Sequence, residues 1–191
     1  MGLDITIGID NDDEVFTFEY ITGENSISDD HHLSRTFCNL ICRDAVIDHE
    51  TELNQISRIT GVDIEPLYLM LEYPNSDELE FMLENAETEE ERQEIIEESE
   101  HNKLKLTNNI DTIYQTITHL INKLNTIQNL SKLLIKTDFD SLNNDVYFSD
   151  FNTDKDKENM RDIFENDLNN FKSLLEYCKA RNTKTVFFNF M

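Results

Sequence analysis

An apolar stripe in the middle of the chain predicts its longest helix. Within residues 104–135, apolar side chains recur at alternating intervals of four and three, which keeps them on one side of a helix. They are Leu106, Ile110, Ile113, Ile117, Leu120, Leu124 and Ile127. Because such a stripe needs an apolar partner, we expect this helix to be the spine of the molecule.

A second stripe near the C-terminus offers that partner. Its apolar positions follow one another at intervals of four and three along the chain, as Met160, Phe164, Leu168, Phe171, Leu175 and Cys178. Two helices that carry matching stripes pack side by side when one connection joins them. We therefore expect a long antiparallel helical hairpin from about residue 102 to residue 180.

Alternating apolar and polar residues at both ends of the chain predict β-strands. Residues 3–9 and 16–20 alternate on either side of a turn at residues 11–13, which predicts a β-hairpin. Residues 185–190 alternate in the same way. Because two strands alone are marginal in water, we expect both termini to join in one small antiparallel sheet packed on helices.

Capping residues and helix breakers divide the first third of the chain into short helices. Residues 28–30 offer N-caps for a helix that ends near Asp48. Thr51 and Gly61 mark the two ends of the next helix, because threonine caps N-termini and glycine adopts the left-handed conformation that ends many helices. A third short helix is expected over residues 63–71.

These elements predict an α+β fold, predominantly helical, with residues 1–191 in a single domain. Residues 1–76 are expected to hold the β-hairpin and the short helices, and residues 77–100 an acidic helical segment. Residues 101–191 are expected to hold the helical hairpin and the C-terminal strand. No internal repeat and no glycine- or serine-rich linker separates these parts.

Charge is distributed unevenly among the three parts. The chain has 40 acidic and 16 basic residues, for a net charge of −24. Residues 1–76 carry −13 and residues 77–100 carry −11, whereas residues 101–191 are neutral overall. Such a surface repels nucleic-acid phosphates and anionic membranes. We therefore expect a basic protein as partner, with no direct nucleic-acid contact and no membrane contact.

Several function classes find no support in the sequence. The three cysteines do not form a disulfide framework, and no signal-peptide-like or membrane-spanning apolar run is present, so we expect a cytoplasmic protein. The four glycines form no phosphate-binding loop, and neither a nucleophile elbow nor an H-E-x-x-H motif occurs. The chain is thus expected to be no enzyme and to hold no cofactor.

One cluster of potential metal ligands suggests an alternative function. Asp29, His31 and His32 lie near the predicted helix start, and Cys38 and Cys42 follow at helical spacing. Carboxylate, imidazole and thiolate groups bind transition metals, which would make the chain a metal-dependent enzyme or a metal-binding regulator. The simpler interpretation is that the acids cap the helix and the cysteines pack in the core.

Residues 150–161 match a calcium-binding loop only in part. Lys155 stands in place of the glycine that the sharp turn requires, and Arg161 in place of the bidentate glutamate. An EF-hand is therefore not expected, although alternate positions carry Asp150, Asn152, Asp154, Asp156 and Glu158.

The acidic segment is the leading functional candidate. A solvated helix face is the plain interpretation, but like charges at helical spacing cost stability, and solubility alone does not require so many. Thr88 and Glu91 form a capping-box pattern that predicts a helix start. Rows of helical carboxylates can occupy a basic groove that otherwise binds nucleic acid. The predicted contact residues are Asp77, Glu78, Glu80, Glu84, Glu87, Glu89, Glu90, Glu91, Glu94, Glu97 and Glu98.

Aromatic residues in the connection between the two long helices are predicted to anchor the same contact. The connection is rich in aspartate and asparagine but also contains Phe139, Tyr147, Phe148 and Phe151. Binding hot spots are enriched in aromatic side chains.

The first five residues, Met1-Gly2-Leu3-Asp4-Ile5, followed by a predicted strand, resemble the start of many small proteins encoded by phages and mobile elements. The 21 asparagines, with abundant isoleucine and lysine, fit an AT-rich genome of that kind. Small acidic proteins from such sources include inhibitors of host-defence nucleases, anti-CRISPR proteins among them. The match covers only these few residues and implies no known activity by itself, but proteins of this class make an anti-defence inhibitor one function to expect.

The leading hypothesis is an acidic, non-enzymatic interaction protein. It would bind a basic surface of a nucleic-acid-handling enzyme, or of that enzyme's complex, by nucleic-acid mimicry or as an allosteric inhibitor. A monomer is expected in that case. Besides the metal-binding alternative, a self-associating coiled-coil structural protein is possible if the stripe within residues 104–135 pairs between chains.

Overall fold

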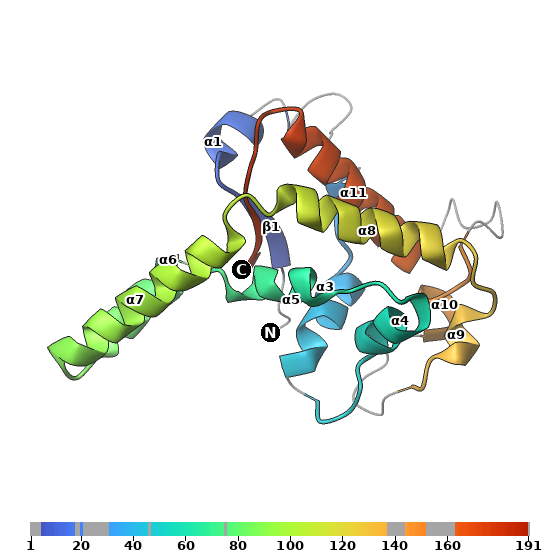
Figure 1. The fold of residues 1–191 in the computed structure, drawn as a ribbon, viewed down its shortest axis with the longest axis horizontal. Coiled ribbons are helices and arrows are strands. Elements are labelled where there is room, and N and C mark those ends of the chain that lie inside the picture. Colours follow the sequence, from blue (N-terminus) through green and yellow to red (C-terminus); the bar gives the residue numbers. More distant parts are fainter. Residues whose placement is uncertain are drawn as a thin grey trace.

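The computed structural model shows helices packed around a small sheet (Figure 1). It describes residues 5–17, 20, 31–45, 47–74, 76–136, 144–151 and 163–190. Within these residues the fold is α+β and predominantly helical, so the predicted fold class is confirmed.

Two strands from opposite ends of the chain form the sheet. β1, Ile5–Ile9, pairs antiparallel with β2, Val186–Phe190, and Ile7 lies opposite Phe188. Alternate residues of β1 are buried, so one face of the sheet packs on the core. The predicted pairing of the two termini is confirmed.

The predicted hairpin partner of β1 is wrong. After β1 the chain forms helix α1, Asp12–Val15, and the described residues 16, 17 and 20 add no strand. Three acidic residues in the first turn of α1 suit the positive end of the helix dipole. The alternating aromatic residues pack on each other instead, since the rings of Phe16 and Tyr20 lie 5.0 Å apart.

Side chains cap the N-termini of two short helices between residues 31 and 74. α3, Arg35–Cys42, starts after Ser34, later than the predicted caps at residues 28–30, which lie outside the described residues. α4, Glu52–Thr60, starts at the predicted cap and ends at Gly61, whose φ is 69°. The other short elements are η2 (Arg43–Ala45), α5 (Glu65–Leu69), η3 (Met70–Glu72), α9 (Leu130–Leu133) and α10 (Asn144–Tyr147).

The two apolar stripes form the predicted antiparallel pair at the centre of the molecule. α8, Ile110–Leu124, packs against α11, Phe164–Lys179, and the two run side by side in Figure 1. The stripe residues within both helices are buried in one apolar cluster that also includes residues of β1, β2 and α3. Because the stripe is buried within one chain, it does not present a surface for pairing with a second copy.

The predicted spine is interrupted at residues 107–109. Asn108 adopts a positive φ of 60°, which asparagine tolerates better than most residues. The Asn109 side chain then ties the break to β2, because it donates to the Val186 carbonyl and accepts the Val186 N–H, each at 2.8 Å. The first stripe residue, Leu106, therefore ends the preceding helix, α7, Glu89–Leu106. The break allows α7 to point away from the core.

A buried polar network joins α11 to α3 and α10. The Asp167 carboxylate accepts hydrogen bonds from the Ser34 N–H and hydroxyl, both at 2.7 Å, and from the Tyr147 hydroxyl at 2.8 Å. All three residues are buried. A buried charge that accepts several hydrogen bonds is compensated, so this network fixes the position of α10 against the two helices.

Because the Tyr147 hydroxyl is buried, we predict that the protein loses stability in alkaline solution. Burial, and then the Asp167 carboxylate, raise the pKa of the Tyr147 hydroxyl well above its ordinary value. An unfolded tyrosine loses its proton near pH 10, whereas the folded one keeps it. The free energy of unfolding should therefore fall as the pH rises above about 10. Urea denaturation across this range measures the slope, which Tyr147→Phe should reduce; an equally steep slope in that variant would contradict the assignment.

Candidate functional site

The acidic segment folds into two antiparallel helices that project from the rest of the molecule. α6, Ser76–Asn85, packs on α7, Glu89–Leu106, and together they extend away from the body in Figure 1. We call residues 76–106 the acidic arm. Of the described arm residues, Leu106 alone belongs to the main apolar cluster. The arm is therefore an appendage whose surface is available on most sides.

Local hydrogen bonds explain why α7 begins where it does. Thr88 Oγ1 accepts the Glu91 N–H at 3.1 Å, and the Glu91 carboxylate accepts the Glu87 N–H at 2.8 Å. The predicted start at Thr88 is confirmed, with the reciprocal bond shifted by one residue from the usual capping box. Glutamates in the first turn and lysines in the last turn also suit the helix dipole.

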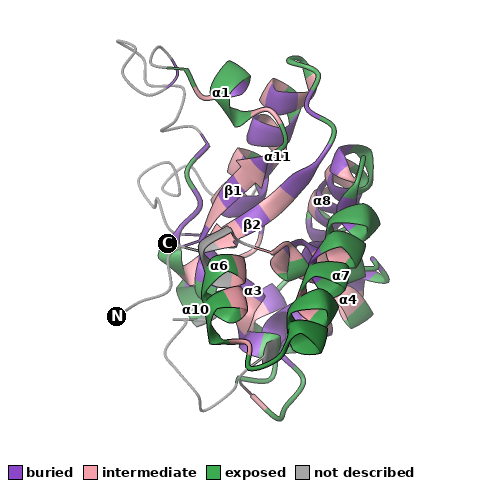
Figure 2. Cartoon of the chain, turned by 90° about the vertical axis from the view of Figure 1, so that its left-hand side faces the viewer, coloured by how far each residue is buried: buried purple, intermediate pink, exposed green. Residues whose placement is uncertain are grey.

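Carboxylates cover the arm. Figure 2 shows α7 largely exposed along its length, and the predicted contact residues from Glu80 to Glu98 are all exposed. Asp77 and Glu78 lie in α6, but their side chains are outside the described part of the chain. Glu90, Glu94 and Glu97 share one face of α7, because they are separated by four and three residues.

Exposed apolar side chains, which were not among the residues predicted from the sequence, accompany these carboxylates. A signal was available: Leu79 and Leu83 define the face of α6 that packs on α7, so Phe81 falls on the opposite side of the helix. Phe81 is 66% exposed. The large apolar residues exposed on the arm are Phe81, Met82, Ile96 and Leu104.

The predicted aromatic anchors are wrong where the structure describes them. Tyr147, Phe148 and Phe151 are all buried. Their ring centroids lie 5.8, 5.5 and 6.1 Å from that of Phe164, at the start of α11. They belong to the core because their short segment folds back onto α11. Phe139 lies outside the described residues.

The metal-ligand candidates are not brought together in the described structure. Asp29 lies outside the described residues, and His32 is exposed. His31 is buried; its Nδ1 lies 3.0 Å from the Tyr20 hydroxyl, and its ring stacks near Tyr20. Among the described residues, no three His, Cys, Asp or Glu side chains are placed to hold a metal ion. The metal-binding hypothesis stays a prediction.

The two cysteines of that candidate cluster pack as small apolar groups. The buried Cys38 thiol donates to the Ile5 carbonyl at 3.6 Å, which links α3 to β1. Burial, and then the neighbouring Cys38, raise the pKa of the Cys42 thiol to about 11. A thiol with so high a pKa is protonated at neutral pH and is a poor nucleophile.

Asp150, the first residue of the partial calcium-loop pattern, caps a helix instead. Its carboxylate accepts the N–H groups of Asn129 and Leu130, at 2.7 and 2.8 Å, at the start of α9. The rest of the pattern from residue 152 to residue 161 lies outside the described residues.

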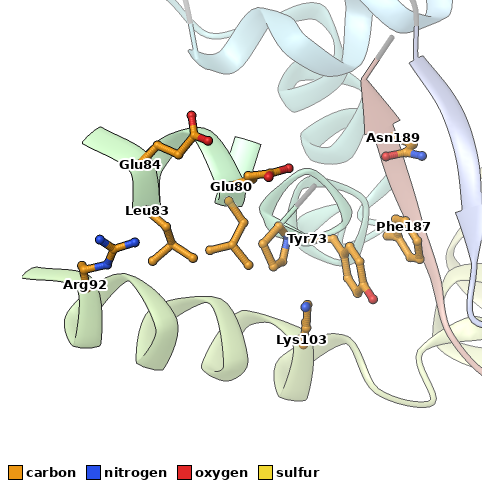
Figure 3. A pocket seen from close by; sticks show the side chains of 10 residues that line it. Tyr73, Glu80, Leu83, Glu84, Arg92, Lys103, Phe187 and Asn189 are labelled. Atoms are coloured by element: carbon orange, nitrogen blue, oxygen red, sulfur yellow. The ribbon is translucent and has the colours of Figure 1, made fainter. Parts of the chain in front are cut away.

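A gap separates the base of the arm from the sheet (Figure 3). Its volume is about 580 Å³. Tyr73 and Phe187 stack beside it with ring centroids 3.7 Å apart and planes 10° apart. The other lining residues come from the arm, from β2 and from the chain just before the arm: Pro74, Leu79, Glu80, Leu83, Glu84, Arg92, Lys103 and Asn189.

Gly8 in β1 leaves the space that the Phe187 ring of this stack occupies. It lies directly opposite Phe187 in the strand register, and a Cβ atom at position 8 would overlap the Phe187 ring. We predict that Gly8→Ala lowers the free energy of unfolding by about 1–3 kcal/mol, measured by urea denaturation. In a Phe187→Ala background the same change should cost much less. An equal cost in both backgrounds would show that the ring is not the cause.

Within the described ranges, each helix is too short or too polar to span a membrane. Comparisons of the chain with protein-family models, with curated proteins and with solved structures found no match.

Proposed function

We propose that the chain is a non-enzymatic interaction protein that inserts its acidic arm into the basic surface of a nucleic-acid-handling enzyme and inhibits or redirects it. The observation that carries this proposal is the exposed row of carboxylates on a helix that projects from the body. A projecting helix can enter a groove of a partner, whereas the same carboxylates on a rounded surface could not.

The charge density of α7 supports mimicry of a nucleic-acid strand. Residues 89–98 carry a net charge of −5, and ten helical residues rise by roughly 15 Å. This is one negative charge per roughly 3 Å of helix axis, against one per about 3.4 Å for each strand of B-DNA. A groove that neutralises a phosphate backbone would therefore meet a similar linear charge on α7.

Apolar side chains on the arm supply the contacts that charge alone lacks. Exposed ion pairs contribute little to affinity and are screened by salt, whereas buried apolar anchors dominate most interfaces. Phe81 and Leu104, exposed by 66% and 71%, take the place of the aromatic anchors that the structure buries. The proposed anchors thus lie on the same element as the charge.

Capture from cells that encode the protein tests this proposal. The immobilised wild-type chain should retain a basic nucleic-acid-binding protein at low salt and release it at high salt. A variant with Glu90, Glu94, Glu97 and Glu98 all changed to lysine should not retain that protein. If the variant captures the same proteins, or if the captured proteins are not basic, the arm is not the contact.

A further inference from the structure

One edge of β1 is not used by the sheet. The Asp10 N–H donates to the Thr185 carbonyl at 3.2 Å, and hydrogen-bonded pairs alternate along an antiparallel ladder. In the register of the sheet, the N–H and C=O groups of Ile5, Ile7 and Ile9 therefore point away from β2. β1 thus has a second edge, which we call the outer edge.

The middle of the outer edge holds two buried backbone groups without a partner. Other hydrogen bonds agree with the alternation, because Asn109 binds the Val186 N–H and C=O on the far side of β2, and the Cys38 thiol donates to the outward Ile5 carbonyl. For the N–H and C=O of Ile7, no partner is present among the described residues. Ile7 is only 8% exposed, and unpaired backbone groups at buried positions are rare. These two groups therefore indicate a place for a ligand that both donates and accepts.

A cavity of about 680 Å³ lies beside the same strand. It is bordered by Ile5–Gly8, and its other walls include the apolar side chains of Phe16, Leu33 and Leu174. β1 contains neither proline nor a charged residue over Ile5–Ile9, although these are the residues that usually protect an edge from pairing with another strand. Backbone hydrogen-bonding groups beside an apolar cavity are what sites for extended peptides offer.

The charge beside the cavity that remains without a partner is negative. Residues 10–14, directly after β1, carry a net charge of −4, and their acids are exposed and form no ion pair among the described residues. Of these acids, Asp12 lines the cavity. Arg35 lines it too but already has an interaction partner, and the lining residues His31 and His32 count as neutral at pH 7. A ligand with positive charge at this end of β1 is therefore favoured.

We propose that the cavity binds an extended peptide segment of a partner protein, which pairs with the outer edge of β1 as an additional strand. The peptide backbone accepts the Ile7 N–H and donates to the Ile7 carbonyl. Apolar residues at alternate positions of the peptide contact Leu33 and Leu174, and basic residues lie at the end beside residues 10–14. No residue of the acidic arm lines this cavity, so the site is separate from the proposed arm contact and does not depend on it.

Amide hydrogen exchange measured by NMR tests this site. The probe is the peptide Lys-Lys-Val-Thr-Val-Thr-Val, blocked at both ends and added to the full chain. It should slow exchange at Ile7 by roughly tenfold or more, because the Ile7 N–H gains an acceptor. Exchange at Gly8 should change little, since its N–H already pairs with Phe187 of β2.

Three results would overturn the proposal. The first is no binding of the peptide at millimolar concentration, and the second is binding that leaves exchange at Ile7 unchanged. The third is an Ile7 amide that is already as protected as that of Gly8 without the peptide, because another segment of the chain or a second copy would then occupy the outer edge.

Two modified peptides separate strand pairing from apolar contact. In an extended peptide, the valine amides lie on one edge and the threonine amides on the other. N-methylation of the valines in one peptide and of the threonines in the other therefore blocks opposite edges. One of the two should bind roughly tenfold or more weakly than the unmodified peptide, and the other should bind nearly as well. Equal affinities of the two modified peptides would overturn the proposed pairing.

A pair of variants tests the charge of the peptide. Asp12→Lys should weaken binding of the same peptide by roughly threefold or more at low salt. Asp48→Lys changes the net charge equally at an exposed position that does not line the cavity, and it should leave the affinity unchanged. Equal effects of the two changes would overturn the assignment of the basic end to residues 10–14.

Discussion

Changing Glu90, Glu94, Glu97 and Glu98 to lysine is expected to weaken binding to the captured partner by roughly 100-fold or more. Each change replaces an attraction by a repulsion on the exposed face of α7, and charges at a basic surface act on association rate and salt dependence together. Surface plasmon resonance at several salt concentrations would show both effects. The wild-type affinity should fall steeply as salt rises, and the variant should lose most of that dependence.

A matched control separates the arm from the net charge of the whole protein. Asp13, Glu14, Asp48 and Glu65 are exposed residues of the body, and their change to lysine alters the net charge by the same amount. Binding by this control variant should stay within a few-fold of wild type, because only long-range attraction is reduced. Equal losses in the two variants would mean that total charge, and not the arm, determines binding.

Replacing Asp167 by alanine is expected to lower the free energy of unfolding by about 3–5 kcal/mol, the largest single-residue effect we predict for the fold. The change leaves the Ser34 N–H and the two hydroxyl groups without the carboxylate that they donate to. Buried donors without acceptors lose the full free energy of desolvation. Urea denaturation followed by circular dichroism would measure the difference.

One smaller substitution, made in two backgrounds, tests whether the network is the cause. Tyr147→Phe removes one of the donors and should cost about 1–2 kcal/mol. In the Asp167→Ala background this second change should cost less, because the hydroxyl has already lost its acceptor. Additive losses would indicate that Asp167 stabilises the fold through a contact other than Tyr147.

Hydrophobic periodicity predicted the centre of the fold well. The stripes that became α8 and α11 were visible because burial on one side of a helix imposes the four-and-three spacing. The break at Asn108 was not visible, since the stripe continues through Leu106 across it. What interrupts the helix is a tertiary contact, the pair of hydrogen bonds between Asn109 and Val186, and a local pattern does not contain it.

The prediction of a β-hairpin at residues 3–20 is wrong for a related reason. Alternation at residues 16–20 satisfied the rule for a strand, but β2 pairs with β1 in the structure and the intervening residues form α1. Sequence patterns report which side of an element is buried, whereas pairing depends on which segments meet in space. The C-terminal strand was nevertheless recognisable from its own alternation, although 177 positions separate the last residue of β1, Ile9, from the first residue of β2, Val186.

The candidate site was predictable in its charge and not in its geometry. The number of acidic residues identified the acidic segment, and the capping pattern at Thr88 predicted the start of α7. The separation of the arm from the core follows from the break at residues 107–109, which the heptad pattern concealed. The prediction of aromatic anchors is wrong for Tyr147 and Phe148, because their rings pack around Phe164 although the segment is rich in aspartate and asparagine.

Competition with DNA is the most direct test of the claim that the arm occupies a nucleic-acid-binding surface. The captured partner, bound to the labelled wild-type chain, would be titrated with a duplex or single-stranded oligonucleotide that the partner binds, with release followed by fluorescence anisotropy. We expect full displacement, with the apparent affinity of the partner for the chain falling in proportion to the oligonucleotide added. Simultaneous binding of the protein and the oligonucleotide, with no change in either affinity, would contradict it.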